Sequence, residues 1–280
     1  MMNDVGSDAS SRMRAAYAAQ IARLASVEDP RIEEAFAQVA REDFLPPPPW
    51  TTISMGAAVV TRDLADIYDN VLVAIDPERG INNGEPSLHA AWIDVVRPQL
   101  GEIVIHVGAG TGYYTAILSL LVGSSGHVEA FEYEPDLAAQ ANHNLQGYSN
   151  VSVHGASAFG RALPKADLIY VNAGVPAPDV EWLRALNLGG RLIFPWQPQK
   201  GWGPAVLVRR LTAGFSIHSL MTVGFISCSG AKETSTRERL PTESDLASIR
   251  SIWMRNDRAP DGSAVAVYDD VWFSTDDIAD

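Results

Sequence analysis

The clearest candidate for chemistry is residues 103–117, with the sequence IVIHVGAGTGYYTAI. Its apolar beginning predicts a strand, Gly108, Gly110 and Gly112 predict a tight turn, and the residues that follow predict a helix. Glycines at such a turn let the backbone approach a ligand closely, and the start of the helix offers N–H groups to an anion. The segment therefore predicts a binding loop for a ligand that carries a phosphate or a carboxylate.

The spacing of the glycines distinguishes two kinds of cofactor. The dinucleotide fingerprint G-x-G-x-x-G requires a glycine at position 113, which is Tyr113 in this chain. The observed G-x-G-x-G is commoner in S-adenosylmethionine sites. The next predicted strand ends at Glu132, 22 residues after Gly110, where a carboxylate can accept hydrogen bonds from both ribose hydroxyls of an adenosine. A purely structural turn and a solvated acid are the alternatives at these positions.

Predicted strands and helices alternate around this loop, which is typical of a doubly wound α/β sheet. The helices are expected at 12–40 (two helices separated by Asp29 and Pro30), 87–96, 113–122, 135–146 and 180–185, the last with Gly189 and Gly190 as its stop signal. The strands are expected at 103–107, 128–131, 151–154, 168–171, 192–194, 205–211 and 216–226. The last two predict an antiparallel hairpin, and the others predict a mostly parallel, Rossmann-like sheet. Residues 51–85 show no regular pattern.

The last fifty residues differ from the rest. Residues 231–280 carry 11 acidic and 6 basic side chains. Residues 242–254 predict a helix that Thr242 caps, with Asp245 at its third position, and residues 264–274 predict a strand. We therefore expect one large domain over residues 1–230 and a small appendage over residues 231–280.

Charge and cysteine content exclude several classes of function. The net charge is −13, which disfavours a nucleic-acid-binding surface and a polybasic membrane anchor. Cys228 is the one cysteine, so the chain has neither an internal disulfide nor a cysteine-rich metal site, and the histidines show no metal-ligand spacing. The N-terminus lacks the apolar segment of a secretory signal, and glycines interrupt the uncharged run at 103–128. We expect a cytoplasmic protein without a metal, and the oligomeric state stays open.

Several segments together resemble the protein-L-isoaspartate O-methyltransferase family of class I S-adenosylmethionine-dependent methyltransferases. They are AREDFLPP (40–47), IYDN (67–70), EPSLHA (85–90), HVGAGTGYYTA (106–116), GHVEAFEYEPDLA (126–138), ADLIYVNAGVP (166–176), LNLGGRLIFPW (186–196) and VGFIS (223–227). The resemblance covers about residues 30–228. It implies a substrate loop at Asn82, Asn83, Gly84 and Glu85, and cofactor contacts at Gly108, Ala109, Gly110, Thr111, Gly112, Glu132, Tyr133, Ala156, Ser157 and Asn172.

The chain departs from this family at three places. The family usually has Thr-Ile-Ser where this chain has Asn82, Asn83 and Gly84, so a serine hydroxyl that contacts substrate is missing. His106 replaces an acid on the first strand; we interpret it as a core histidine, and His89 as a packed or capping residue. Ala156 replaces the aspartate of a Gly-Asp-Gly turn, and Ser157 or a main-chain carbonyl could compensate. The N–H of Gly84 could bind a substrate carboxylate, although a simple turn is the alternative.

The resemblance implies methyl transfer to a carboxylate, and chemistry explains why no catalytic triad is needed. A carboxylate has a pKa of about 4, so it is already ionised near neutral pH and requires no general base. The expected acceptor is an isoaspartyl residue in a protein or peptide. The alternatives are another small-molecule or specialised peptide acid, and a non-catalytic cofactor-binding homologue. A dehydrogenase shares the fold, but the glycine spacing opposes it.

Overall fold

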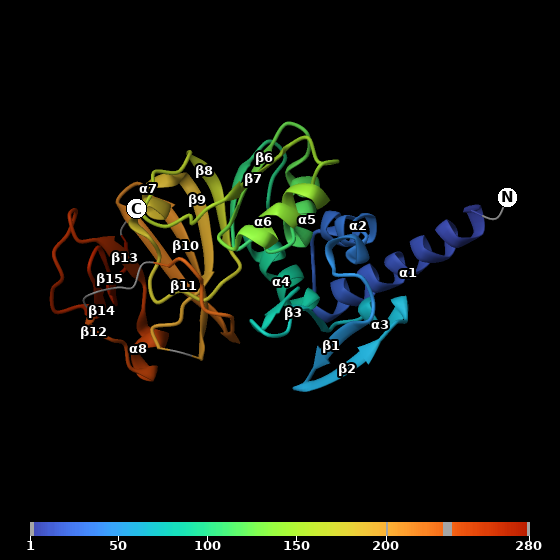
Figure 1. Cartoon of the computed structure of the whole chain (residues 1–280). Coiled ribbons are helices and arrows are strands. Elements are labelled where there is room, and N and C mark those ends of the chain that lie inside the picture. The colour runs from blue at the N-terminus through green and yellow to red at the C-terminus, as the bar shows by residue number, and fades with distance from the viewer. Residues whose placement is uncertain (1–2, 200, 232–236, 279–280) are drawn as a thin grey trace. The chain divides into compact units, whose positions relative to one another are not determined.

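The structure is a computed structural model of the 280-residue chain, and it describes residues 3–199, 201–231 and 237–278. The chain forms two compact units, each assembled from several stretches of sequence (Figure 1). Unit 1 comprises Met1–Gly101, Ala109–Val128 and Asp136–Val153, and unit 2 comprises Glu102–Gly108, Glu129–Pro135 and His154–Asp280.

Unit 1 contains most of the helices, and those expected from the sequence are confirmed. The expected ones are α1 (Asn3–Leu24), α2 (Pro30–Gln38), α4 (Pro86–Val96), α5 (Tyr113–Val122) and α6 (Pro135–Asn144). The sequence did not predict the 3₁₀ turn η1 (Arg41–Phe44) or the short helix α3 (Leu64–Ile67). Asp29 caps α2 by accepting a hydrogen bond from the N–H of Arg31 at 3.0 Å, and Pro30 occupies the first turn. The buried rings of Tyr17, Phe36 and Tyr113 hold α1, α2 and α5 together.

The expectation that residues 51–85 are irregular is wrong. They contain a four-stranded sheet in the order β2-β1-β3-β4, formed by β1 (Trp50–Ser54), β2 (Ala57–Thr61), β3 (Leu72–Asp76) and β4 (Ile81–Asn82). Met55 and Gly56 join β1 to β2 with positive φ at both positions, which is the geometry of a tight hairpin turn. The strands escaped prediction because β2 shows no alternation of buried and exposed residues and is exposed along most of its length.

The large sheet contains, within the described residues, eleven strands in the order β12-β14-β15-β13-β11-β10-β9-β8-β5-β6-β7. Those expected from the sequence are β5 (Ile103–Val107), β6 (His127–Glu132), β7 (Val151–Gly155), β8 (Ala166–Val171), β9 (Leu186–Pro195), β10 (Trp202–Leu211) and β11 (Gly214–Gly224). β8 pairs in parallel with β5 and with β9, whereas β10 pairs antiparallel with β9 and β11. The expected α/β fold, with a parallel centre and an antiparallel C-terminal hairpin, is thereby confirmed.

Two local expectations around β9 need correction. The helix α7 (Val180–Ala185) is present, and Asp179 caps it through a hydrogen bond from the N–H of Glu181. It ends directly in β9, so Gly189 and Gly190 lie inside that strand and do not stop the helix. A side chain at position 190 would meet the carbonyl oxygen of Asn187 at 2.7 Å, so the glycine serves close backbone packing.

The C-terminal residues extend the large sheet. The helix α8 (Glu243–Ser248) has the expected capping box between Thr242 and Asp245, but it is short, and residues 251–254 form the strand β13 (Ser251–Met254). The single strand expected at 264–274 is a hairpin of β14 (Ala264–Tyr268) and β15 (Val271–Ser274), and β12 (Arg237–Arg239) pairs with β14. β13 pairs with β11, which connects the extension to the rest of the sheet.

The extension shares a hydrophobic core with the strands before it. Phe273 stacks on Trp196 with ring centroids 4.2 Å apart, and both side chains are fully buried. Ile252 and Tyr268 belong to the same buried cluster as Phe194. We therefore propose that residues 231–280 are an extension that depends on the preceding domain for its core.

This packing makes a prediction about stability. Phe273→Ala should lower the free energy of unfolding by about 3–5 kcal/mol, since it removes a buried ring and leaves a cavity against Trp196. The measurement is urea unfolding followed by circular dichroism. Leu188→Ala, at a 68% exposed position on β9, is the control and should change stability by less than about 0.5 kcal/mol. A protein truncated after Ala231 that keeps full stability would contradict the shared core.

Candidate functional site

The order of the strands in unit 2 creates a place where a ligand can bind. The chain runs from β5 to β6 and β7 on one side, and then returns as β8 on the other side of β5. Loops that leave neighbouring strands in opposite directions open a crevice at their carboxyl ends. The residues after β5 and β8 are Gly108 and Asn172, both expected cofactor contacts.

Gly108 and Asn172 meet at this point. The N–H of Asn172 donates to the carbonyl oxygen of Val107 at 2.8 Å, and the N–H of Gly108 donates to that of Phe131 at 2.9 Å. Gly108 has φ +75°, and a Cβ there would lie 3.3 Å from the carbonyl oxygen of Asn172. The glycine therefore allows the two strand ends to approach closely, a role that the sequence did not predict for it.

The other residues of the glycine turn have distinct roles. Gly110 has φ +57°, and no heavy atom lies within 4 Å of the position that its Cβ would take, so the turn is open there. Gly112 has φ +100°, and a Cβ would lie 2.7 Å from a methyl carbon of Leu145, so this glycine serves packing. Ala109 and Thr111 are buried, and the Thr111 hydroxyl donates to the carbonyl oxygen of Phe44 at 2.6 Å. The Thr111 side chain is thus committed to the fold.

Glu132 ends β6 as expected and is largely buried, with 7% of its surface exposed. Its Oε1 accepts a hydrogen bond from the N–H of Glu134 at 2.9 Å, which fixes the orientation of the carboxylate. Tyr133 is half exposed, and its ring lies against Gly230, where a Cβ would come within 2.6 Å of the ring. Burial and the negative charge of Glu132 raise the pKa of the Cys228 thiol to about 12, so this thiol stays protonated at neutral pH.

The segment that follows β11, residues 225–231, was not predicted as part of the site, and we call it the strap. The N–H of Gly174 donates to the carbonyl oxygen of Ile226 at 2.8 Å, and the N–H of Cys228 donates to that of Gly174 at 2.9 Å. Its last part meets Tyr133 and Ser157. The strap therefore joins the carboxyl ends of β6, β7 and β8, and the segment VGFIS was the sequence signal for it.

Ser157 holds the strap. Its hydroxyl donates to the carbonyl oxygen of Gly230 at 3.0 Å and accepts from the N–H of Phe159 at 3.0 Å. Ala156 lies in the same turn, and its N–H donates to the carbonyl oxygen of His154. We therefore assign Ser157 to positioning the strap, whereas direct contact between its hydroxyl and a cofactor stays a prediction.

The loop of Asn82, Asn83, Gly84 and Glu85 lies in unit 1 and is fixed by Arg41, which sequence analysis did not single out. The Arg41 side chain is fully buried, and its Nε donates to the side-chain oxygen of Asn83 at 3.0 Å. The other guanidinium nitrogens donate to four carbonyl oxygens, those of Ile67, Asp69, Val71 and Gly84, over 2.7–3.3 Å. A buried arginine with these partners holds the loop in one conformation.

Gly84 cannot offer its N–H to a substrate in this conformation, which corrects the expectation from the sequence. The side-chain oxygen of Asn82 accepts that N–H at 2.9 Å, as asparagine commonly does in turns. Gly84 has φ +73°, and a Cβ there would lie 2.6 Å from Nε2 of His89. His89 is fully buried and stacks on Tyr114 with centroids 3.7 Å apart, so the expected packed histidine is confirmed. The imidazole takes the space that a side chain at position 84 would need.

Glu85 is exposed and precedes α4. Its carboxylate accepts hydrogen bonds from the side chains of Asn70 at 3.0 Å and Ser87 at 2.9 Å. These bonds connect the end of the loop to the segment IYDN, whose role the sequence did not reveal. Glu85 therefore orders the start of the helix that carries His89.

His106 is the expected core histidine. It is fully buried in β5 beside the ring of Tyr170, and burial lowers its pKa to about 3. The imidazole is therefore neutral at physiological pH and supplies no charge at this position.

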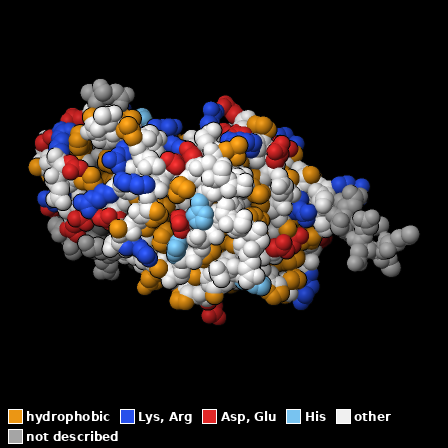
Figure 2. Space-filling view, turned by 90° about the horizontal axis from the view of Figure 1, so that it is seen from above, with side chains coloured by type: hydrophobic (Ala, Val, Ile, Leu, Met, Phe, Trp, Pro, Cys, Tyr) orange, Lys and Arg blue, Asp and Glu red, His pale blue; other side chains and the backbone are white. Residues whose placement is uncertain are grey.

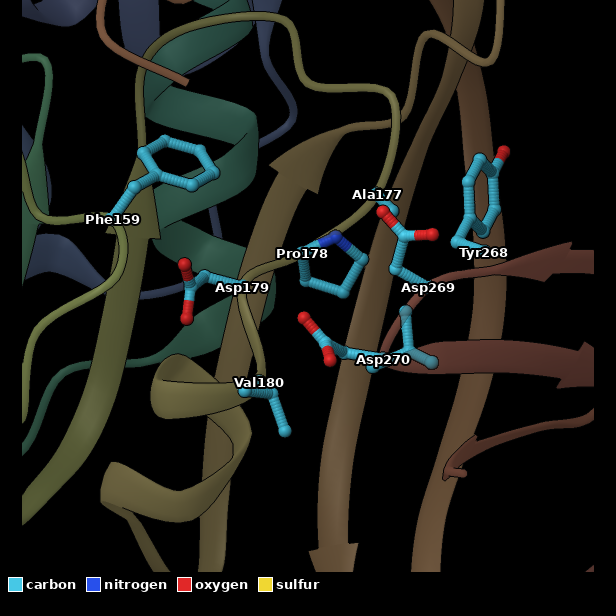
Figure 3. A pocket seen from close by; sticks show the side chains of 9 residues that line it. Phe159, Ala177, Pro178, Asp179, Val180, Tyr268, Asp269 and Asp270 are labelled. Carbon is cyan, nitrogen blue, oxygen red and sulfur yellow. The ribbon is translucent and has the colours of Figure 1, made fainter. Parts of the chain in front are cut away.

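A separate cavity of about 40 Å³ lies where α7 begins and the turn from β14 to β15 passes. Figure 3 shows Asp179, Asp269 and Asp270 grouped around Pro178 in this cavity. The carboxylate of Asp179 already accepts the N–H groups of Gly160 and Glu181. The space is sufficient for water molecules and too small for a nucleoside.

The described part of the chain contains no cluster of His, Cys, Asp and Glu that could hold a metal ion. It also contains no helix long and apolar enough to cross a membrane. On the face shown in Figure 2, acidic and basic side chains are mixed with one another.

Comparison with known proteins gives a consistent result. A family model described as protein-L-isoaspartate(D-aspartate) O-methyltransferase matches residues 16–233. A protein-L-isoaspartate O-methyltransferase from Rhodopseudomonas palustris is 32% identical over 210 residues, which cover 74% of this chain and 88% of the relative. One from Ignicoccus hospitalis is 30% identical over 146 residues, or 50% of this chain and 69% of the relative.

Solved structures show the same fold. A protein-L-isoaspartate O-methyltransferase superposes with a TM-score of 0.67 at 21% identity, covering 93% of this chain and 86% of that one. A structure from Plasmodium falciparum, described as such an enzyme in complex with S-adenosyl-L-homocysteine, gives 0.63 at 17% identity, with coverage of 77% and 98%. Residues 234–280 lie beyond the family model.

The geometry of the glycine turn and of Glu132 predicts the effect of two substitutions on cofactor binding. Gly110→Val should abolish binding of S-adenosylmethionine in calorimetry, because a branched side chain fills the open space and is strained at this φ. Glu132→Ala should weaken binding by about 1–3 kcal/mol, the range for hydrogen bonds to a charged group. Glu129→Ala, which removes the same charge from the same strand, is the control. Unchanged affinity in both test variants would overturn the assignment.

The crowding at Gly84 predicts that a serine there does not restore a substrate contact. Gly84→Ser should lower the free energy of unfolding by about 1–2 kcal/mol for the backbone conformation and by about 1–3 kcal/mol for the clash with His89. Gly80→Ser is a matched control, since Gly80 has φ +69° and open space around it. Urea unfolding of both variants separates the two costs. Equal losses would show that His89 moves aside easily.

Proposed function

Since the chain belongs to the protein-L-isoaspartate(D-aspartate) O-methyltransferase family, we propose that it methylates the carboxylate of isoaspartyl residues in proteins or peptides. The observation that carries this proposal is the family match over residues 16–233, which includes every residue predicted to bind cofactor or substrate. The chain is an S-adenosylmethionine-dependent methyltransferase.

The residues present fit this cofactor. The open space beside Gly110 admits a ligand close to the backbone, and Glu132 is an acceptor of the kind that ribose hydroxyls require. Gly108 and Asn172 bring two strand ends together at the crevice. We propose that these residues, with Ala109, Thr111, Gly112, Tyr133 and Ala156, line the cofactor site. Most of these contacts involve the backbone, so the departures at Ala156 and His106 leave them intact.

The chain has to align reactants and exclude water. Bound S-adenosylmethionine supplies an electrophilic methyl group on a positively charged sulfur. The acceptor carboxylate is ionised at neutral pH, so no side chain has to remove a proton. Alignment of the acceptor in line with the methyl group, in a dry site where the opposite charges cancel, accounts for the rate enhancement. This chemistry agrees with the absence of a Ser-His-Asp arrangement among the predicted site residues.

The loop at 82–85 differs from the family's usual sequence, and this difference bears on which acid is methylated. We propose that it contacts the substrate, but neither the N–H nor a side chain of residue 84 provides the hydrogen bond of the family's serine. Another small-molecule or peptide acid is therefore the second candidate. We further propose a cytoplasmic location, since the single cysteine cannot form a disulfide within the chain.

A methyl-transfer assay tests the proposal. An isoaspartyl peptide should accept labelled methyl groups from S-adenosylmethionine, whereas the peptide with a normal aspartyl residue at the same position should not. Gly110→Val is the inactive control, because it removes cofactor binding. If neither peptide is methylated while calorimetry shows that the cofactor binds, the acceptor is another acid.

A further inference from the structure

Trp202 exposes 76% of its surface, although the other six tryptophans of the chain are buried or only partly exposed. Tryptophan combines a large apolar area with few rotatable bonds, and it is enriched among residues that dominate binding energy at protein interfaces. A single exposed tryptophan can be incidental. Its setting therefore decides whether it has a role.

The indole ring of Trp202 lies against Gly224 of the neighbouring strand. Trp202 pairs with Gly224 on β11, and a Cβ at position 224 would lie 3.3 Å from the ring. The absence of a side chain at this glycine lets the ring lie against the backbone. We call Trp202 and Gly224 together the Trp202 platform.

Hydrogen bonds hold the backbone in place on both sides of Trp202. The side chain of Gln197 is buried, and its amide donates to the carbonyl oxygens of Gly201 at 2.6 Å and Phe225 at 3.1 Å. The N–H of Trp196 donates to the carbonyl oxygen of Pro204 at 2.8 Å, which closes the hairpin at its base. A partner would therefore lose little entropy by ordering this surface, a condition for productive binding.

The platform is connected to the proposed cofactor crevice within unit 2. β9 runs parallel to β8, so the residues after Pro195 emerge at the same edge of the sheet as Asn172. Val175 and Trp196 form a parallel bridge, and the Gln197 carboxamide occupies the place where a side chain at Gly174 would stand. One continuous set of contacts thus runs from the turn after β8 to the hairpin that carries Trp202.

The net charge of the chain favours an apolar contact with the substrate at the platform. The proposed acceptor is a carboxylate, and the protein carries a net charge of −13, so long-range electrostatics do not attract it. Apolar contacts with the chain that flanks the acceptor do not suffer from this repulsion.

We propose that the Trp202 platform binds an apolar side chain of the polypeptide that flanks the methyl acceptor. This inference rests on the proposed function and adds the substrate's neighbouring residues to it. Trp202 takes no part in methyl transfer.

The test compares three isoaspartyl peptides in the methylation assay: a blocked tripeptide, a decapeptide with leucines on both sides of the acceptor, and the same decapeptide with serines instead. Trp202→Ala should raise KM for the leucine peptide at least tenfold and change kcat less than twofold. KM for the tripeptide and the serine peptide should stay within twofold. Trp202→Phe should recover most of the affinity, and Leu188→Ala, an exposed apolar residue on β9, should have no effect.

Fluorescence provides a readout that does not depend on turnover. Acrylamide should quench the wild type mainly through Trp202, because five of the other tryptophans are buried and Trp253 is only partly exposed. The leucine decapeptide should protect this component, and the serine decapeptide should not. Trp202→Ala should lose most of the quenchable component.

The outcomes separate this inference from the proposed function. Methylation of all three peptides with unchanged KM in Trp202→Ala overturns the inference and leaves the function intact. If no isoaspartyl peptide is methylated, the proposed function fails, and a lack of protection in the quenching experiment then overturns the inference as well. A dimer in sedimentation that Trp202→Ala converts to a monomer would make a second copy the occupant and overturn the inference.

Discussion

The reversal of the chain at β5 is the constraint on which the proposed site depends. Because β6 and β8 lie on opposite sides of β5, the residues after β5 and β8 must part, and a crevice forms between them. A glycine suits this close approach at position 108, because φ is +75° and a Cβ there would lie 3.3 Å from the carbonyl oxygen of Asn172. Within unit 2, Glu132 ends the strand next to β5, and the strap bonds to Gly174 beyond the end of β8.

A second constraint acts in unit 1, where the buried guanidinium of Arg41 holds the loop at 82–85 in place. Arg41 is satisfied by four carbonyl oxygens and by the side chain of Asn83, so its charge is spread over groups that secondary structure leaves unused. Removing one partner of such a network leaves a buried polar group without compensation, which costs more than the bond itself contributes. The loop at 82–85 therefore owes its shape to a residue some forty positions earlier in the chain.

Sequence patterns predicted the parts of the structure that interactions between neighbouring residues determine. The glycine turn, the cap at Asp29, the capping box at Thr242 and the strand that ends at Glu132 follow from neighbouring residues, and all are present. Long-range packing determined what was missed. The exposed strand β2 has no alternation to detect, the C-terminal hairpin is held by a ring from β15 on Trp196, and Arg41 finds its partners across the fold. Whether the Gly84 N–H is available for a substrate likewise depends on the conformation of the Asn82 side chain, whose oxygen accepts it. The sequence does not reveal that conformation.

The same contacts limit how this chain can hold an anionic acceptor. Arg41 has committed its guanidinium to carbonyl groups, the Gly84 N–H is bonded to Asn82, and His106 is neutral because burial lowers its pKa to about 3. None of these groups adds positive charge for a carboxylate. In the proposed reaction the sulfonium of the bound cofactor would supply positive charge beside the acceptor, and a dry site would strengthen their attraction. With the proposed Trp202 platform, the polypeptide on either side of the acceptor would supply contacts by which one acid is distinguished from another.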